Sequence, residues 1–392
     1  MISVEEALDI VNKNAPRPRP SQEVISPALG GAVLAETILA PIDLPMFDQS
    51  SMDGYALCMH TKTHYRIVGE IQAGSDTSFT LQAGEAVRIF TGAPVPSSAD
   101  AVVIQEKVQR DGDTLTVASV IKPGQNIRTV GSQVPKGSVV LKQGTVLNAA
   151  ALGLLQSLGL AQVQVYKKPR VAILVTGDEL ISIDEPLAQG KIYESNSLVL
   201  KTALHQMGIT EITVLWAKDT QEDTERALAE GLKHDVLLIS GGISVGDYDF
   251  VGSSLATLGV KTRFYKVRQK PGKPIFFGTK EDTHIFALPG NPASTLSCFY
   301  VYVLPILYTY LGKTPAHLPI RELPLNQAVE NKFDRALFLK AQATDTTVSM
   351  IDEMNSATLI SFAHANALVY IPETVQKAEK NTNVKTWILP EL

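Results

Sequence analysis

Four polar segments, three of which contain glycine, each come directly after an apolar run in the second half of the chain. The runs are residues 171–175, 212–216, 236–239 and 285–288, and the segments that follow them are 176–179, 217–219, 240–249 and 289–294. In a parallel sheet the carboxyl ends of the strands meet at one edge, where open α/β folds bind their ligands. We therefore expect these segments to form one shared site.

Glycines in segment 240–249 suit an anion. Gly241, Gly242 and Gly246 allow a tight turn that points backbone N–H groups at a phosphate, and a helix start that follows adds positive dipole character. An ordinary glycine turn is the alternative. The sequence therefore predicts an anionic ligand beside this loop, and a purely structural turn remains the alternative.

Two further features are typical of oxyanion binding. Asn291 and Pro292 predict the N-cap and first position of a helix whose start presents Ser294, although plain capping explains them equally well. Lys270 and Lys273 lie on a proline- and glycine-bound turn that cannot continue a helix, with a solvated surface turn as the alternative. Paired ammonium groups held on a stiff turn suit a phosphate or a similar oxyanion.

Acidic residues are expected at the same edge. Glu179, Asp219, Asp247 and Asp249 supply hard oxygen ligands beside the predicted phosphate site, a combination typical of magnesium. Asp219 and Asp249 could instead cap the helices that follow them. Taken together, we favour a metal site formed by Glu179, Asp219 and Asp249.

Other segments give weaker indications of a functional site. Residues 47–56 and 91–96 are polar or rigid turn segments without an amphipathic pattern, and either could be purely structural. No histidines are spaced as a metal pair, and no Ser/His/Asp order indicates a serine hydrolase.

The elements that must position these residues indicate a multidomain α/β protein. The four apolar runs alternate with helical patterns at 197–207, 221–233 and 250–258, which predicts a doubly wound, mostly parallel sheet. Short β-rich runs fill 44–141, an apolar helix is expected at 148–160, and strand-like runs return after Pro315. We expect domains at 1–45 with 142–168, 46–141, 169–314 and 315–392. Ser3 and Glu6 predict a capping box that opens the first helix.

Bulk properties narrow the function classes. The 392-residue chain has a formal net charge of −5 and a pI near 5.9, which argues against nucleic acid as a partner but allows a small local basic pocket. Cys58 and Cys298 form no disulfide or zinc pattern, and the N-terminus lacks a signal-peptide pattern, so we expect a cytoplasmic protein. The uncharged stretch 295–312 is interrupted by Pro305, and we expect a buried or interface helix and no membrane contact.

Six motifs in order resemble the molybdopterin molybdenumtransferase (MoeA) family and the E domain of gephyrin. The motifs lie at residues 52–56, 91–96, 176–180, 240–246, 270–274 and 288–294. The resemblance implies a molybdopterin-binding-like α/β domain with an inserted β domain, an elongated α+β linker domain and a C-terminal β-barrel-like domain. It also implies a homodimer whose active site includes residues from the partner's inserted domain.

The resemblance further implies a reaction, in which adenylylated molybdopterin and molybdate give molybdenum cofactor and AMP with Mg²⁺ required. A molybdopterin adenylyltransferase and apo-molybdoenzymes are the partners it suggests. The catalytic residues it implies are Asp53, Thr91, Glu179, Asp219, Asp249, Lys270 and Lys273. The substrate-binding residues it implies are Thr176, Gly177, Asp178, Ser240, Gly241, Gly242, Ser244, Gly246, Asp247, Pro289, Gly290, Asn291, Ser294, Lys340 and Ser356.

The sequence departs from the family pattern at three places. Residues 131–133 read Gly-Ser-Gln where the family has Gly-Glu-Asp, and residues 354–356 retain only the hydroxyl of Gln-Gly-Ser, at Ser356. Lys340, two residues after Phe338, takes the place of an arginine expected at molybdate, and it keeps the charge without the planar fork. A molybdopterin adenylyltransferase and a gephyrin-like scaffold without turnover remain as alternative functions.

Overall fold

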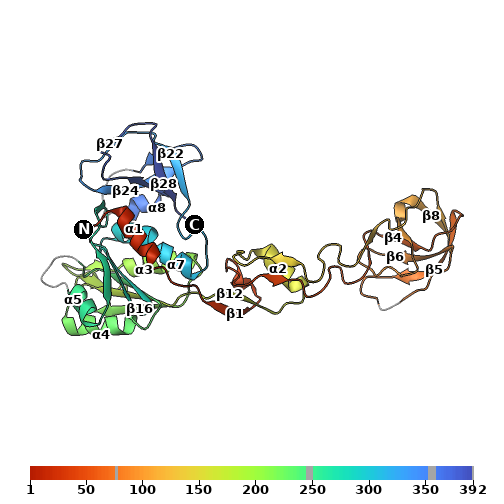
Figure 1. Ribbon diagram of the computed structural model, residues 1–392, viewed down its shortest axis with the longest axis horizontal. Helices are drawn as coiled ribbons and strands as arrows, with labels where there is room; N and C mark the ends of the chain where they lie inside the picture. Colours follow the sequence, from red (N-terminus) through yellow and green to blue (C-terminus); the bar gives the residue numbers. More distant parts are fainter. Residues whose placement is uncertain (76–77, 244–249, 352–358, 391–392) are drawn as a thin grey trace. The chain divides into compact units, whose positions relative to one another are not determined.

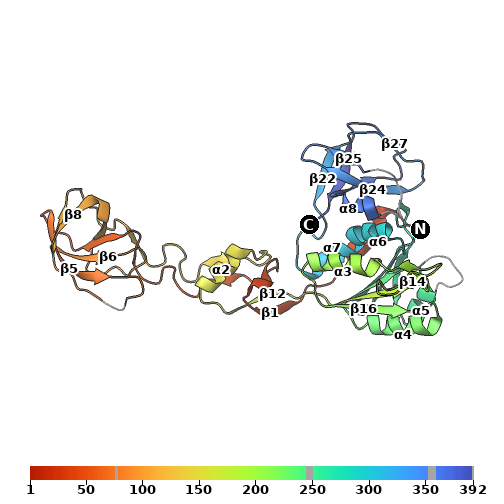
Figure 2. The same cartoon turned by 180° about the vertical axis from the view of Figure 1, so that it is seen from behind.

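The computed structural model describes residues 1–75, 78–243, 250–351 and 359–390. By its internal contacts the chain divides into two compact units, drawn in Figures 1 and 2. Unit 1 comprises Met1–Gln22, Gly31–Ala35 and Gln164–Leu392, and unit 2 comprises Glu23–Gly30 and Glu36–Val163.

Unit 1 is built on a six-stranded sheet in the order β16-β13-β17-β21-β20-β18. Its strands are β13 (Val171–Thr176), β16 (Ile212–Ala217), β17 (Val236–Ser240), β18 (Lys261–Tyr265), β20 (Phe276–Lys280) and β21 (Thr283–Leu288). The first four in sheet order run parallel, β20 runs antiparallel to β21, and β18 runs antiparallel to β20. The predicted doubly wound, mostly parallel α/β fold is confirmed.

Helices cover both faces of this sheet (Figures 1 and 2). One face packs against α3 (Asn196–Gln206), α6 (Pro292–Cys298) and α7 (Leu304–Tyr310), and the other against α4 (Gln221–Gly231) and α5 (Phe250–Thr257). Alternate residues of β13 therefore enter different cores: Ile173 packs with the first set and Leu174 with the second. Burial on both faces explains why the strands read as continuous apolar runs.

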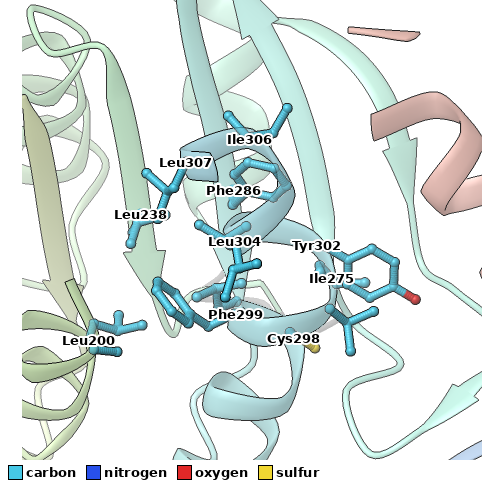
Figure 3. Close-up of a cluster of buried hydrophobic side chains, with 14 of the residues drawn as sticks. Leu200, Leu238, Ile275, Phe286, Cys298, Phe299, Tyr302, Leu304, Ile306 and Leu307 are labelled. Carbon is cyan, nitrogen blue, oxygen red and sulfur yellow. The ribbon is translucent and has the colours of Figure 1, made fainter. Parts of the chain in front are cut away.

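The apolar stretch after Pro292 is a core helix of unit 1. By length and composition Pro292–Tyr310 could cross a membrane, yet most of it is buried among its neighbours. Figure 3 shows Phe299, Tyr302 and Leu304 within this core. The helix passes through a π-helical turn, Phe299–Val303, just before Pro305, whose missing N–H interrupts the regular ladder. The expectation of a buried helix is confirmed.

The C-terminal part of unit 1 is a β-sheet that includes the lysine segment. Its strands are β19 (Gln269–Lys270), β22 (Ile320–Pro324), β24 (Ala336–Ala343), β25 (Val348–Met350), β26 (Ala367–Ile371) and β28 (Asn383–Ile388), beside β23 (Val329–Glu330), β27 (Lys377–Ala378) and α8 (Leu359–Ala363). β19 pairs in parallel with β24, which ties the start of the lysine turn to this sheet. The first helix, α1 (Val4–Lys13), has the predicted capping box and packs into the α/β core.

Unit 2 contains a six-stranded sheet of its own, in the order β7-β4-β6-β5-β9-β8. Its strands are β4 (Gly54–Leu57), β5 (His64–Ile71), β6 (Glu85–Ile89), β7 (Ala101–Ile104), β8 (Val108–Asp111) and β9 (Thr114–Val117), with one helix, α2 (Ala149–Ser157). The remaining strands are β1 (Pro20–Val24), β2 (Ile38–Leu39), β3 (Gln49–Ser50), β10 (Ile127–Arg128), β11 (Val139–Leu141), β12 (Gln162–Tyr166), β14 (Leu180–Ile181) and β15 (Ile192–Tyr193). Of these, β14 and β15 belong to unit 1, and the chain passes from one unit to the other within β1 and β12.

Candidate functional site

A cleft of about 690 Å³ lies at the carboxyl edge of the parallel strands in unit 1. Residues from all four predicted segments line it: Thr176, Gly177, Glu179, Asp219, Gly241, Gly242, Pro289, Gly290, Asn291 and Ser294. The lysine turn adds Lys270 and Lys273, and the C-terminal part adds Phe333 and Arg335. The structure thus brings the segments together as the parallel arrangement requires.

Several predicted residues lie elsewhere or cannot be placed. Ser244, Gly246, Asp247, Asp249 and Ser356 lie outside the described residues. Asp178 and Ser240 do not line the cleft themselves. The Asp178 N–H donates to Asp219 at the cleft wall, and the Ser240 hydroxyl accepts from Asn196, which also donates to the cleft residue Gly290. Asp53 and Thr91 belong to unit 2.

Asp219 is held by two donors from the β13 end. Its Oδ1 accepts the Thr176 hydroxyl at 2.8 Å, and its Oδ2 accepts the Asp178 backbone N–H at 3.1 Å. Helix α4 is capped by the next residue, Thr220, whose hydroxyl accepts the Asp223 N–H. The alternative in which Asp219 caps this helix is therefore wrong, and its carboxylate remains at the cleft wall.

Two glycines at this edge lie close to neighbouring atoms. A Cβ on Gly177 would lie 2.8 Å from the Glu179 Oε2 atom, and a Cβ on Gly241 would lie 2.8 Å from the Thr176 carbonyl oxygen. Gly241 also has a φ of +91°, in the left-handed region that favours glycine. These contacts let Glu179 fold over the β13 end and bring the ends of β13 and β17 together.

A buried amide that sequence reasoning missed joins the β17 and β21 ends. The Nδ2 of Asn196 donates to the Ser240 hydroxyl and to the Gly290 carbonyl, each at 2.7 Å. Asn196 lies just before the predicted helical pattern at 197–207 and belongs to no local motif, so only the tertiary fold reveals this contact. The β17 and β21 ends are thereby fixed at the cleft.

Asn291 occupies the N-cap position of α6, as predicted, but its side chain makes no capping hydrogen bond. Its Oδ1 is buried and has no partner among the described residues, while the residue lines the cleft. A buried oxygen without a partner is uncommon in folded proteins and often marks a place where a ligand or water binds. Asn291 therefore occupies the cap position, but its side chain does not cap α6 by a hydrogen bond.

The lysine turn rests on a buried polar network. Gln269, with no exposed surface, donates from Nε2 to the Pro271 carbonyl at 2.9 Å, and its Oε1 accepts the hydroxyl of the fully buried Tyr302. A Cβ on Gly272 would lie 2.3 Å from the Cys298 Sγ, so the turn packs directly on α6. Lys270 and Lys273 are thus presented from a turn whose backbone is fixed.

The C-terminal part contributes different residues from the one predicted. Lys340 lies within β24, is 8% exposed, and does not line the described cleft; burial lowers the pKa of its ammonium group. Arg335 and Phe333 line the cleft instead, and the Lys270 Nζ lies 3.7 Å from the Phe333 ring centroid. Neither residue belongs to a local motif, which explains why sequence reasoning missed them.

In unit 2, Asp53 and Thr91 form an exposed pair. Asp53 Oδ1 accepts both the Thr91 backbone N–H and the Thr91 hydroxyl, each at 2.8 Å. Both hydrogen bonds hold the pKa of Asp53 below its usual value, and the bond from the backbone N–H makes the larger contribution. The carboxylate is therefore ionised and oriented.

The charges at the cleft suit an anion and a cation together. Lys270, Lys273 and Arg335 can bind an oxyanion, while Glu179 and Asp219 present carboxylate oxygens. Within the described part of the chain no three acidic, histidine or cysteine side chains gather as a metal cluster, and Asp249 of the predicted set falls outside it.

Comparison with known proteins gives matches along nearly the whole chain. Residues 2–159 match a family model described as "MoeA N-terminal region (domain I and II)", residues 172–309 one described as "Probable molybdopterin binding domain", and residues 322–389 one described as "MoeA C-terminal region (domain IV)".

Curated relatives and solved structures agree with these matches. The chain is 34% identical over 384 residues to a molybdopterin molybdenumtransferase of Haemophilus influenzae, covering 95% of each chain, and 37% identical over 306 residues to one of Nostoc, covering 75% of this chain and 70% of that relative. It superposes on a crystal structure of a molybdopterin biosynthesis MoeA protein from Pyrococcus horikoshii with a TM-score of 0.86, 29% identity and full coverage of both chains.

Proposed function

Because the chain belongs to the MoeA family of molybdopterin molybdenumtransferases, we propose that it inserts molybdenum from molybdate into adenylylated molybdopterin and releases AMP. The observation that carries this proposal is the cleft at the carboxyl edge, which Lys270 and Lys273 line together with two carboxylates. Its volume of about 690 Å³ is suitable for a nucleotide-sized substrate.

The cationic wall binds the oxyanions in this proposal. Lys270 and Lys273 stabilise molybdate or the phosphates as point charges, and Arg335 can bind an oxyanion through two parallel N–H groups. The buried Gln269–Tyr302 pair keeps the lysine turn in place, so little reorganisation is needed when charge develops during the reaction. Asn291 and Ser294 add polar atoms at the α6 start.

The acidic wall fits a hard divalent cation. Glu179 and Asp219 offer oxygen donors at the cleft, and the hydroxyl and N–H bonds to Asp219 orient its carboxylate as outer partners do in metal sites. We assign Mg²⁺ to these two residues together with Asp249. Bound there, Mg²⁺ would neutralise charge on the diphosphate linkage of the adenylate. Binding of Mg²⁺ at this place would depend on the orientation of the Asp219 carboxylate.

The proposal extends to the assembly. We propose a cytoplasmic homodimer in which Asp53 and Thr91 of the inserted domain complete the site of the partner chain. A molybdopterin adenylyltransferase would supply the adenylylated substrate, and apo-molybdoenzymes would receive the product. Neither nucleic acid nor a membrane takes part.

Release of AMP tests the reaction directly. Purified protein is given adenylylated molybdopterin with Mg²⁺ and molybdate, and with each ion omitted, and the product is then offered to an apo-molybdoenzyme. Molybdate-dependent AMP release with an active reconstituted enzyme is the expected result. Absence of both from a folded protein would contradict the transferase function and favour a binding role.

A further inference from the structure

Unit 1 contains a second cavity, of about 460 Å³, at the amino edge of the same sheet. We call it the amino-edge pocket; its lining includes residues 14–17, Arg19, residues 167–169, Asp235, Arg263, Thr279, residues 281–282, His284 and Tyr310. Residues 167–169 precede β13, Asp235 precedes β17, and residues 281–282 precede β21. The pocket therefore lies at the opposite strand ends from the transferase cleft.

The acidic residues of this pocket are mostly committed to ion pairs. Asp235 Oδ2 accepts the Arg170 backbone N–H at 2.7 Å and lies 3.5 Å from the Arg170 Nε, and Arg170 is outside the lining. Asp282 pairs with Arg19 at 2.5 Å. Among the described residues Glu281 is the lining acid that makes no ion pair.

The basic residues are mostly uncommitted. The side chains of Arg17, Lys167 and Lys168 make no hydrogen bond or ion pair with any residue that the structure describes, and Arg263 donates from Nε to the neutral Thr279 hydroxyl at 3.0 Å. The pocket thus concentrates uncompensated positive charge in a chain whose formal net charge is −5. Such a local field attracts an anion.

The pocket has a buried floor. The ring of His284 contacts the Asn14 carbonyl through Nε2 at 2.7 Å and the Tyr310 hydroxyl through Nδ1 at 3.1 Å, and the same hydroxyl donates to the Asp282 carbonyl at 3.1 Å. Burial lowers the pKa of His284, so the ring does not supply positive charge at neutral pH. The concave shape is therefore built into the core, and the charge comes from the rim.

We propose that the amino-edge pocket binds a small polyanion through a diphosphate group, either free or part of a nucleotide. Arginine guanidinium groups bind phosphate oxygens in a bidentate way, and lysines add point charges. Its concave shape and volume suit a small molecule, whereas nucleic-acid binding needs an extended basic surface.

The ligand would join two segments that are distant in sequence. Arg17 and Arg19 lie just before the first residues of unit 2, and Lys167 and Lys168 lie just after its last. These segments already meet through the Lys167 N–H, which donates to the Arg19 carbonyl at 2.8 Å. An anion in the pocket would neutralise the positive charges of both segments. This inference does not depend on the transferase reaction.

Calorimetric titration of the full-length protein tests the pocket, with pyrophosphate in one arm and ADP in the other. The variant is Lys167→Gln/Lys168→Gln, and its matched control is Lys270→Gln/Lys273→Gln, which removes two lysines from the cleft instead. We expect the first variant to weaken one binding event by about tenfold or more and to leave the cleft event unchanged. The second variant should show the reverse.

The two arms identify the source of the diphosphate. Loss of pyrophosphate binding in Lys167→Gln/Lys168→Gln supports a free diphosphate, and loss of a tighter ADP event in the same variant supports a nucleotide. Unchanged binding of both probes in this variant would overturn the proposal, as would losses confined to Lys270→Gln/Lys273→Gln. Lys167 is exposed and Lys168 half-buried, and thermal unfolding of the variant checks that the fold is retained.

Discussion

Two carboxylates, one in each unit, are held by the same pair of donor types. Asp219 accepts a threonine hydroxyl and a backbone N–H, and so does Asp53. Hydrogen bonds of this kind restrict the rotation of a carboxylate. At both places a threonine orients an acid.

Asp219→Ala should abolish turnover and leave the fold intact, because the residue lies at the sheet edge and outside the apolar cores. We expect the rate of AMP release to fall by about 100-fold or more, since an oriented charge at the reacting group is lost. Thr176→Val is the matched control, which keeps the carboxylate and removes one of its donors, and it should lose less. Full activity of Asp219→Ala, with a native circular dichroism spectrum, would count against the assigned site.

Thr91→Val should raise the pKa of Asp53 toward its usual value. The hydroxyl bond disappears, but the larger contribution, the Thr91 backbone N–H, remains, so the rise is partial. A depressed carboxyl pKa adds stability above the unfolded-state pKa, and this stability is lost as the pH falls through the folded-state pKa. In the Thr91→Val variant, this contribution to stability should therefore be lost at a higher pH.

An NMR titration of the Asp53 carboxyl carbon measures this shift. The control is Thr114→Val, which changes an exposed residue of β9 in the six-stranded sheet of unit 2. It should leave the Asp53 titration unchanged. An unaltered pKa in Thr91→Val would show that the hydroxyl bond does not hold the carboxylate in solution.

Local sequence could indicate the residues that follow strands but not their tertiary partners. Asp219 and Gly241 were found because they come directly after apolar runs. Asn196 and Arg335 reach the cleft region from elements that carry no local motif, so their contribution depends on how the fold brings those elements together. Lys340 shows the converse: its position after Phe338 suggested a role, but β24 places it in a buried position away from the described cleft.

At the scale of elements, the lysine turn is fixed from two sides. Its first residues pair with β24, and its glycine packs against α6. The sequence predicted a stiff turn from its prolines and glycine, but it contained no sign of the buried Gln269–Tyr302 pair below it, because a glutamine and a tyrosine 33 positions apart form no pattern. The α/β alternation was predictable because buried parallel strands are apolar throughout.

Gly272→Ala should displace the lysine turn. Its φ of +83° costs an alanine about 1–2 kcal/mol, and the added Cβ would lie 2.3 Å from the Cys298 Sγ, which adds about 1–3 kcal/mol of overpacking. Gly259→Ala is the matched control, with a φ of +76° and nothing within 4 Å of its Cβ. Substrate affinity, measured by titration, should fall only in Gly272→Ala.

The thermal unfolding of the same two variants separates strain from clash. Both should lower the unfolding temperature of unit 1, and Gly272→Ala should lower it further. Equal destabilisation of the two variants, with equal substrate affinity, would mean that the turn tolerates the contact with α6.

At the scale of the whole molecule, the predicted site residues are divided between two compact units. The cleft lies in unit 1, and the Asp53–Thr91 pair lies in unit 2. The sequence predicted four domains, with a change from β-rich runs to alternating strands and helices near Pro169. Its residue pattern alone could not show whether Asp53 acts on its own chain or on a partner chain; only the family resemblance implies the partner chain.

Mixing two inactive variants distinguishes those arrangements. If Asp53 acts on the cleft of the partner chain, a dimer of one Asp53→Ala chain and one Asp219→Ala chain contains one site with both acids intact and one with neither. Random exchange of chains then restores about a quarter of the wild-type rate, since half of the dimers in a two-fold assembly are mixed and each has one working site.

If Asp53 acts within its own chain, every site in the mixture lacks one acid and the rate stays at the level of the single variants. The measurement is AMP release after the two variants are mixed, unfolded and refolded together, with each variant refolded alone as the control. Restoration requires both the homodimer and the exchange of unit 2 between sites. A mixture that forms dimers yet stays inactive would place Asp53 in the cleft of its own chain, or outside the reaction.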